Sequence, residues 1–90
     1  ISAYFTFFCS LSGLLLLGSR AVESWYSEIS AYNFSSPGFS MSTGHFTQVV
    51  WRTSIQVGVG IAYNGNLQRA VVVANYLPPG NMIGIFANNV

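Results

Sequence analysis

Few side chains in this chain of 90 residues are able to do chemistry. It has one histidine (His45), one cysteine (Cys9), two glutamates (Glu23 and Glu28) and no aspartate. A neutral imidazole can ligate zinc or act as a base, and a carboxylate can ligate a metal or exchange a proton. Glu23 and Glu28 are five residues apart, so on a helix they point in different directions. Chemistry by a pair of carboxylates is therefore not expected.

A nucleophilic mechanism finds little support either. Cys9 lies in an uncharged segment, whereas activation of a thiolate needs cationic or polar surroundings. No serine stands in a G-x-S-x-G elbow, and no aspartate is present to orient His45. Considered alone, Glu28 is expected to be a solvated helix carboxylate and His45 a structural histidine. A helix dipole would disfavour the charged imidazolium form of His45, whereas a nearby Glu28 would favour it. The sequence does not decide between these two effects.

The composition excludes several classes of protein. Hydrophobic residues make up 51% of the chain and charged residues 6%, with a formal net charge of +1. A nucleic-acid binder needs a clustered basic face, and a disordered tail needs low hydrophobicity, so no nucleic-acid partner is expected. A single cysteine cannot form an internal disulfide.

Residues 1–20 differ from the remainder because no charge precedes Arg20. We interpret this hydrophobic segment in three ways. It is a signal peptide or membrane anchor, or it is non-native sequence translated from an intron, or it is a buried helix or strand. The sequence leaves these alternatives open.

From residue 21 onward the periodicity predicts helices followed by strands. Val22, Trp25, Ile29 and Tyr32 recur at helical spacing and predict a helix over 21–32. Ser42 or Thr43 is expected to cap a second, short helix. The apolar face of that helix is a set of three residues, namely Phe46, Val49 and Val50.

Alternation over 57–63 predicts a strand, and a return strand is expected from Arg69 to Leu77. Asn64-Gly65 indicates a two-residue hairpin turn between them, and Pro78-Pro79-Gly80 a type II turn. Gly58 and Gly60 are interpreted as packing glycines. The core is expected to include four aromatic residues, namely Trp25, Phe46, Trp51 and Tyr76.

Two ordered motifs, GHFTQVVW at 44–51 and VVANYLPPGN at 72–81, stand out. With WYSEI at 25–29 upstream, they resemble the signatures of the CAP superfamily, which comprises cysteine-rich secretory proteins, antigen 5 and pathogenesis-related 1 proteins. Most secreted members have a disulfide cysteine where Ala74 stands. The sequence therefore looks closest to the Golgi-associated plant-pathogenesis-related branch, which lacks those disulfides.

The resemblance implies an α+β fold, a partial α-β-α sandwich of helix, short helix and antiparallel hairpin that lacks its N-terminal part. Residues 21–90 would be the C-terminal portion of a CAP domain. The resemblance also implies that Glu28 and His45 lie in the family's cleft, which holds two histidines and two glutamates. The other two would belong to an earlier region, so a zinc ion would find only His45 as a histidine ligand.

Three functional hypotheses follow from the resemblance. The leading one is a non-enzymatic module that binds lipid, a membrane surface or a protein partner, with homo-oligomers expected, on the cytosolic face of the Golgi membrane. The second is a secreted defence or signalling protein. The third is a metal-dependent hydrolase-like site built on His45 and Glu28. A fragment without independent function is a further alternative, because a missing half would expose the apolar face of the sheet.

Overall fold

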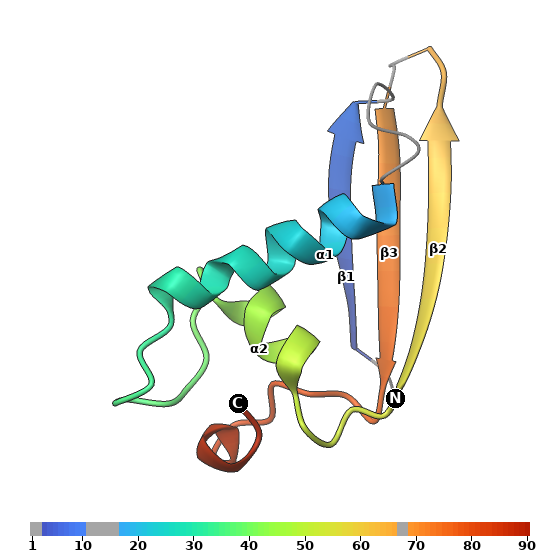
Figure 1. The fold of residues 1–90 in the computed structure, drawn as a ribbon. Helices are drawn as coiled ribbons and strands as arrows, with labels where there is room; N and C mark the ends of the chain where they lie inside the picture. Colours follow the sequence, from blue (N-terminus) through green and yellow to red (C-terminus); the bar gives the residue numbers. More distant parts are fainter. Residues whose placement is uncertain (1–2, 11–16, 67–68) are drawn as a thin grey trace.

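The computed structural model describes residues 3–10, 17–66 and 69–90 (Figure 1). Its elements in chain order are β1 (Ala3–Ser10), α1 (Leu17–Ser27), the 3-10 helix η2 (Glu28–Ala31), α2 (Gly44–Val50), β2 (Gln56–Asn64), β3 (Arg69–Leu77) and the 3-10 helix η3 (Phe86–Asn88). Helices and an antiparallel sheet confirm the predicted α+β class.

The sheet places β3 between its two neighbours, in the order β1-β3-β2, and both pairings are antiparallel. The observed β3 has the predicted bounds, Arg69 to Leu77. Its run from Val71 to Val73 suits a central strand because both faces of such a strand are apolar. The predicted strand over 57–63 lies within the observed β2.

The hairpin between β2 and β3 differs from the predicted two-residue turn. The last pair of the ladder is Asn64 with Arg69, so the connection spans residues 65–68. Residues 67 and 68 lie outside the described part. The observed register places Ile61 opposite Val72, which keeps the apolar residues of both strands on one face. That register outweighs the local turn preference of Asn64-Gly65.

The core lies between α1 and the central strand. Ala21 and Trp25, one helical turn apart, are buried together with small residues of β3, namely Ala70, Val72 and Ala74. Small side chains on β3 let the helix approach closely enough for the Trp25 ring to fill the gap. Truncating a buried Trp typically costs about 3–5 kcal/mol of stability.

The first helix is shifted relative to its prediction. It begins at Leu17 rather than residue 21, and its last predicted turn is the 3-10 helix η2. Val22, expected in the apolar stripe, is half exposed because Ala21 and Trp25 face β3 instead. Among the described residues, no helix has the length and apolar character needed to cross a membrane.

A second cluster of aromatic side chains surrounds α2. The buried Phe46 contacts the rings of Tyr26, Tyr32 and Phe34, with centroids 5.6, 5.5 and 6.4 Å away. Trp51 is buried beyond the end of α2 and meets Phe86 of η3 edge to face, with the centroids 4.9 Å apart. These contacts confirm the predicted core positions of Phe46 and Trp51. Tyr76 is partly buried against the α1–β3 core.

The hydrophobic segment 1–20 is only partly described. Residues 3–10 form β1, which pairs along its whole length with β3, from Ala3 opposite Tyr76 to Ser10 opposite Arg69. Of the three interpretations of the segment, residues 3–10 therefore agree with the one that expects a strand. Residues 1–2 and 11–16 lie outside the described part, and the origin of the segment stays a prediction.

In the described part of the chain, helices cover one face of the sheet (Figure 1). On the other face, a side chain added at Gly58 or Gly60 would meet nothing within 4 Å. The interpretation of these two as packing glycines is therefore wrong for the described residues. Those residues form two layers of the expected three-layer sandwich.

Candidate functional site

The two predicted site residues, Glu28 and His45, lie in direct contact. Glu28 opens η2 and His45 stands in the first turn of α2, so the two ends of the 32–43 loop bring them together. The Nδ1 atom of His45 lies 2.9 Å from Oε2 of Glu28. Both side chains are partly exposed, at 35% for His45 and 22% for Glu28.

Glu28 also caps helix α2 from outside. Its Oε1 accepts hydrogen bonds from the backbone N–H groups of His45 and Phe46, both at 3.0 Å. These donors belong to the first turn of the helix, where backbone N–H groups have no partner within the helix. Thr43 occupies the N-cap position but makes no capping bond with its side chain. The predicted capping by a Ser42 or Thr43 hydroxyl is therefore wrong, because the Glu28 carboxylate occupies that place.

The contacts of His45 fix its ring orientation. An ionised carboxylate only accepts hydrogen bonds, so its partner Nδ1 carries the proton. In the neutral ring the lone pair is then on Nε2, the nitrogen that would bind a metal or accept a proton. Trp25 stacks on the imidazole, with centroids 6.1 Å apart and an angle of 11° between the planes. Trp25 is thus both a core residue and a support for His45.

The described residues do not by themselves fit a zinc site. No group of three or more His, Cys, Asp and Glu side chains gathers in the described part of the chain. Both oxygens of Glu28 are engaged by His45 and the α2 backbone. A catalytic zinc ion needs three protein ligands and a structural one needs four. The role of His45 as a metal ligand therefore stays a prediction.

The second sequence motif packs on the first. The backbone N–H of Gly80 donates to Oε1 of Gln48, at 2.8 Å, inside the molecule. A Cβ atom at Gly80 would lie 2.7 Å from both Nε2 of Gln48 and Cγ of Trp51. Gly80 is therefore required by close approach to α2, and it does not have the positive φ of the predicted type II turn. That turn prediction is wrong.

Asn81 completes the joint between the two motifs. It adopts a positive φ of 57°, a conformation that Asn tolerates better than most residues. Its Nδ2 donates to the carbonyl oxygen of Gly44 at 2.9 Å, and its Oδ1 accepts from the hydroxyl of Thr47 at 2.6 Å. One side chain thereby ties the 78–81 segment to the first turn of α2.

Gln48 extends this polar network into the core. It is fully buried, and its Nε2 donates to the hydroxyl of Ser54 at 2.9 Å. Ser54 in turn donates to the carbonyl oxygen of Pro78 at 2.7 Å. We call α2, Glu28 and residues 78–81 together the α2 unit. Both the Oε1 and the Nε2 atoms of the buried Gln48 amide have hydrogen-bond partners, as polar groups in a core usually do.

Four residues of this arrangement were not predicted from the sequence, namely Gly44, Thr47, Gln48 and Asn81. The predicted apolar face of α2 was Phe46, Val49 and Val50. The structure buries Thr47 and Gln48 with Phe46 and leaves the two valines partly exposed. The sequence signal for a buried hydrogen-bond network was the pair of uncharged polar residues, Thr47 and Gln48, that follows Phe46. Polar residues that are buried usually form hydrogen bonds.

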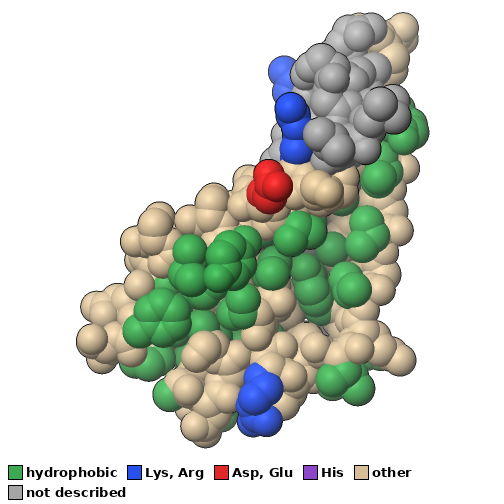
Figure 2. All heavy atoms as spheres, viewed as in Figure 1, with side chains coloured by type: hydrophobic (Ala, Val, Ile, Leu, Met, Phe, Trp, Pro, Cys, Tyr) green, Lys and Arg blue, Asp and Glu red, His purple; other side chains and the backbone are tan. Residues whose placement is uncertain are grey.

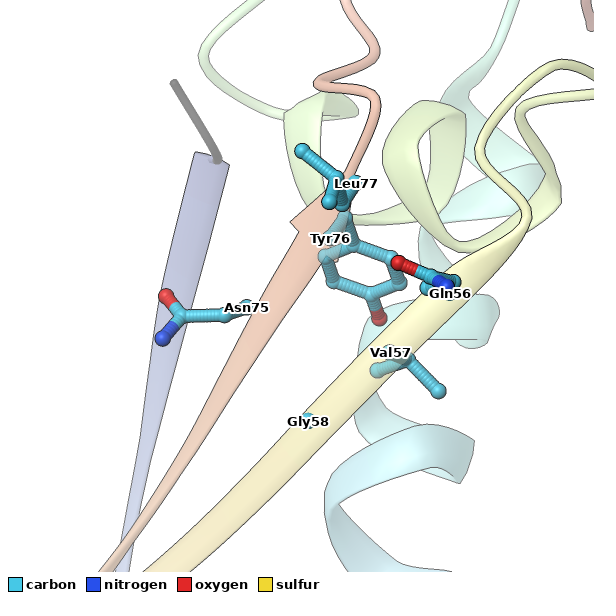
Figure 3. A pocket seen from close by; sticks show the side chains of 6 residues that line it. All are labelled: Gln56, Val57, Gly58, Asn75, Tyr76 and Leu77. Carbon is cyan, nitrogen blue, oxygen red and sulfur yellow. The ribbon is translucent and has the colours of Figure 1, made fainter.

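A wide hollow of about 590 Å³ lies on the sheet rather than beside His45 (Figure 3). Its lining comes from β2 and β3 and consists of Gln56, Val57, Gly58, Asn75, Tyr76 and Leu77. Tyr76 is the titratable side chain of this described lining, and burial raises the pKa of its hydroxyl above the usual value. A neutral phenol is a poor base, so this hollow does not resemble a catalytic site.

Comparisons with known proteins place the chain in a family. The profile of the family described as CAP, the cysteine-rich secretory protein family, matches residues 12–76. Protein PRY2 of Saccharomyces cerevisiae is 47% identical over 70 residues, which are 78% of this chain and 21% of the relative. Golgi-associated plant pathogenesis-related protein 1 of Homo sapiens is 45% identical over 75 residues, which are 81% of this chain and 48% of the relative.

Pathogenesis-related protein 1B of Nicotiana tabacum is 41% identical over 75 residues, with 81% of this chain and 44% of the relative covered. The chain thus spans between about a fifth and about half of the length of these relatives. The human relative supports the resemblance to the Golgi-associated branch. The matched range includes Glu28, His45 and the first half of the second motif, and the chain belongs to the CAP family.

Proposed function

We propose that this chain is a non-enzymatic CAP module that binds lipid at a membrane surface. The supporting observation is an apolar groove of about 320 Å³ between the 37–39 loop and the C-terminal segment 83–87. Its described lining contains no charged side chain and comprises Pro37, Gly38, Phe39, Ile83, Gly84, Phe86 and Ala87. A groove of this kind offers a hydrocarbon chain apolar contacts without burying a charge.

Exposed apolar side chains stand at and near this groove. Ile83 is 83% exposed and Met41 is 88% exposed, and Phe39, Met82 and Ile85 are each about half exposed. Apolar side chains of this size gain about 1.5–3 kcal/mol each when they leave water. Several of them on two neighbouring segments favour insertion into the apolar part of a membrane surface.

The charge of the chain suggests how such binding would depend on lipid type. A formal net charge of +1 gives only weak attraction to an anionic surface. We therefore expect binding that depends mainly on apolar contact and little on salt. The Golgi-associated human relative supports a site on the Golgi membrane, and we propose its cytosolic face.

Vesicle flotation tests the proposal with a matched pair of variants. Ile83→Ser removes an exposed isoleucine at the groove, and Ile55→Ser removes a 79% exposed isoleucine before β2. With phosphatidylcholine vesicles, we expect Ile83→Ser to weaken binding roughly tenfold and Ile55→Ser to leave it unchanged. Absence of wild-type binding to neutral and anionic vesicles, or equal effects of the two variants, would refute the proposal.

The alternative is a secreted defence or signalling protein, for which the name of the tobacco relative, pathogenesis-related protein 1B, is the support. Retention of residues 1–19 on the mature, cell-associated chain would exclude it. N-terminal sequencing of the protein recovered from cells and from medium makes this distinction.

A further inference from the structure

Strand β2 forms an outer edge of the sheet, with one row of its backbone groups facing away from β3. In the described residues β2 pairs with β3 alone. All nine residues of β2 are exposed. An edge of this length presents N–H and C=O groups that another strand can pair with.

This edge lacks the devices by which proteins usually keep edges from pairing. The sequence of β2, QVGVGIAYN, contains neither a charged residue nor a proline. Its register with β3 continues without a bulge from Gln56 opposite Leu77 to Asn64 opposite Arg69. Charges, prolines and bulges are the common protections, so β2 is open to pairing over residues 57–63.

The same strand carries an apolar row on the face that bears the helices. Its four members are 43–61% exposed, although three of them lie opposite buried residues of β3, and they are Val57, Val59, Ile61 and Tyr63. The space-filling view shows apolar side chains continuing from the helices toward the side of the sheet (Figure 2). An occupant of this edge must therefore offer both a strand and an apolar face.

We propose that β2 pairs antiparallel with β2 of a second copy of this chain, about a twofold axis at Gly60. In this register Val57 lies opposite Tyr63 of the second copy, and Val59 lies opposite Ile61. The two apolar rows then become continuous, and no charge meets a like charge because β2 has none. On the other face Gly60 meets Gly60, where a side chain has open space.

Two arguments favour a second copy over a lipid at this edge. Hydrocarbon cannot satisfy the outward backbone groups of β2, whereas a strand can. The register is also self-complementary, as an isologous dimer interface requires. A nine-residue edge is smaller than the 20–30 residues per side of a standard interface, so we expect a weak dimer.

Sedimentation equilibrium between about 10 µM and 1 mM tests the dimer. Val59→Lys places a charge on the edge at a side chain that is 61% exposed in the monomer. We expect it to raise the dimer dissociation constant about tenfold or more. The control Ile83→Lys, at an exposed site in the C-terminal segment, should leave dimerisation unchanged. A monomer at all concentrations, or a dimer that Val59→Lys leaves intact, would overturn the proposal.

Oxidative cross-linking tests the register without depending on a charge. In a Cys9→Ser background, Gly60→Cys places two thiols opposite each other across the axis, with Cα atoms about 4.5–5.5 Å apart. Gly58→Cys instead separates them by about 14 Å along the strands. With oxidised glutathione, we expect a disulfide-linked dimer for Gly60→Cys only. Cross-linking through residue 58 but not 60, or through neither, would overturn this register.

Discussion

The α2 unit and strand β2 lie in one small domain but differ in how their groups find partners. In the α2 unit, Thr47 and Gln48 are fully buried, and their polar atoms bond to Asn81, Gly80 and Ser54. In β2, all nine residues are exposed, and among the described residues nothing lies within 4 Å of a Cβ atom at Gly58 or Gly60. The first region makes these hydrogen bonds among the described residues, whereas the second exposes both its outer edge and its apolar row.

This contrast separates what the two CAP motifs do from what the sheet does. The motifs lock α2, Glu28 and the 78–81 segment into one hydrogen-bonded unit that orients His45. The sheet provides the backing for α1, and its β2 edge remains available for contacts. We therefore expect substitutions in the α2 unit to change stability and substitutions in β2 to change association.

The largest difference in stability between the two regions is expected when a glycine of each region, Gly80 or Gly58, is replaced by alanine. Gly80→Ala puts a Cβ atom 2.7 Å from Gln48 and Trp51, so it should destabilise the fold by about 1–3 kcal/mol through overpacking. Gly58→Ala meets nothing within 4 Å and should be neutral or stabilising by up to about 1 kcal/mol. Urea unfolding of both variants measures the difference. A similar loss of stability in both variants would contradict the distinction between the α2 unit and β2.

A smaller difference is expected from the two glutamates. Glu28→Gln weakens the charge-assisted bonds to the N–H groups of His45 and Phe46, which should lower stability by about 1–2 kcal/mol. Glu23, exposed on α1, makes no described contact of that kind, so Glu23→Gln should stay within about 0.5 kcal/mol. Thermal unfolding followed by circular dichroism checks both. An unaffected Glu28→Gln would show that the external cap contributes nothing.

The smallest difference compares two buried threonines at the start of α2. The hydroxyl of Thr47 bonds to Asn81, whereas that of Thr43 has no partner among the described residues. Thr47→Val should therefore destabilise the fold by about 1 kcal/mol, and Thr43→Val should be neutral or stabilising. Chemical unfolding of the two variants side by side distinguishes them. Equal changes would mean that the hydrogen bond to Asn81 has no net effect.

Much of the sheet was predictable from the sequence because it depends on local patterns. The return strand was predicted with the bounds of β3, and alternation predicted a strand that lies within β2. Strand β1 was only one of three alternatives for residues 1–20, because its pairing with β3 joins segments far apart in the chain. The two-residue Asn64-Gly65 turn was wrong because the sheet register, a tertiary property, determines where the hairpin closes.

The contact between Glu28 and His45 was suggested by resemblance and not by pattern, and their role in a functional site stays a prediction. The family motifs indicated that Glu28 and His45 share a cleft, and the structure places them 2.9 Å apart. No local rule could identify Glu28 as the cap of a helix that begins 16 residues later, since capping rules look at neighbouring residues. The sequence predicted that Gly80 is needed for a turn. The structure shows instead that glycine is needed because a Cβ atom there would lie too close to Gln48 and Trp51.

Hydrogen exchange at two backbone amides tests the central claim, that the Glu28 carboxylate holds His45 at the start of α2. In the wild-type chain the amides of His45 and Phe46 donate to Glu28, so both should be protected. In Glu28→Ala both should exchange faster, while the amide of Gly80, which donates to Gln48, keeps most of its protection. Equal exchange of His45 and Phe46 with and without the carboxylate would contradict the account.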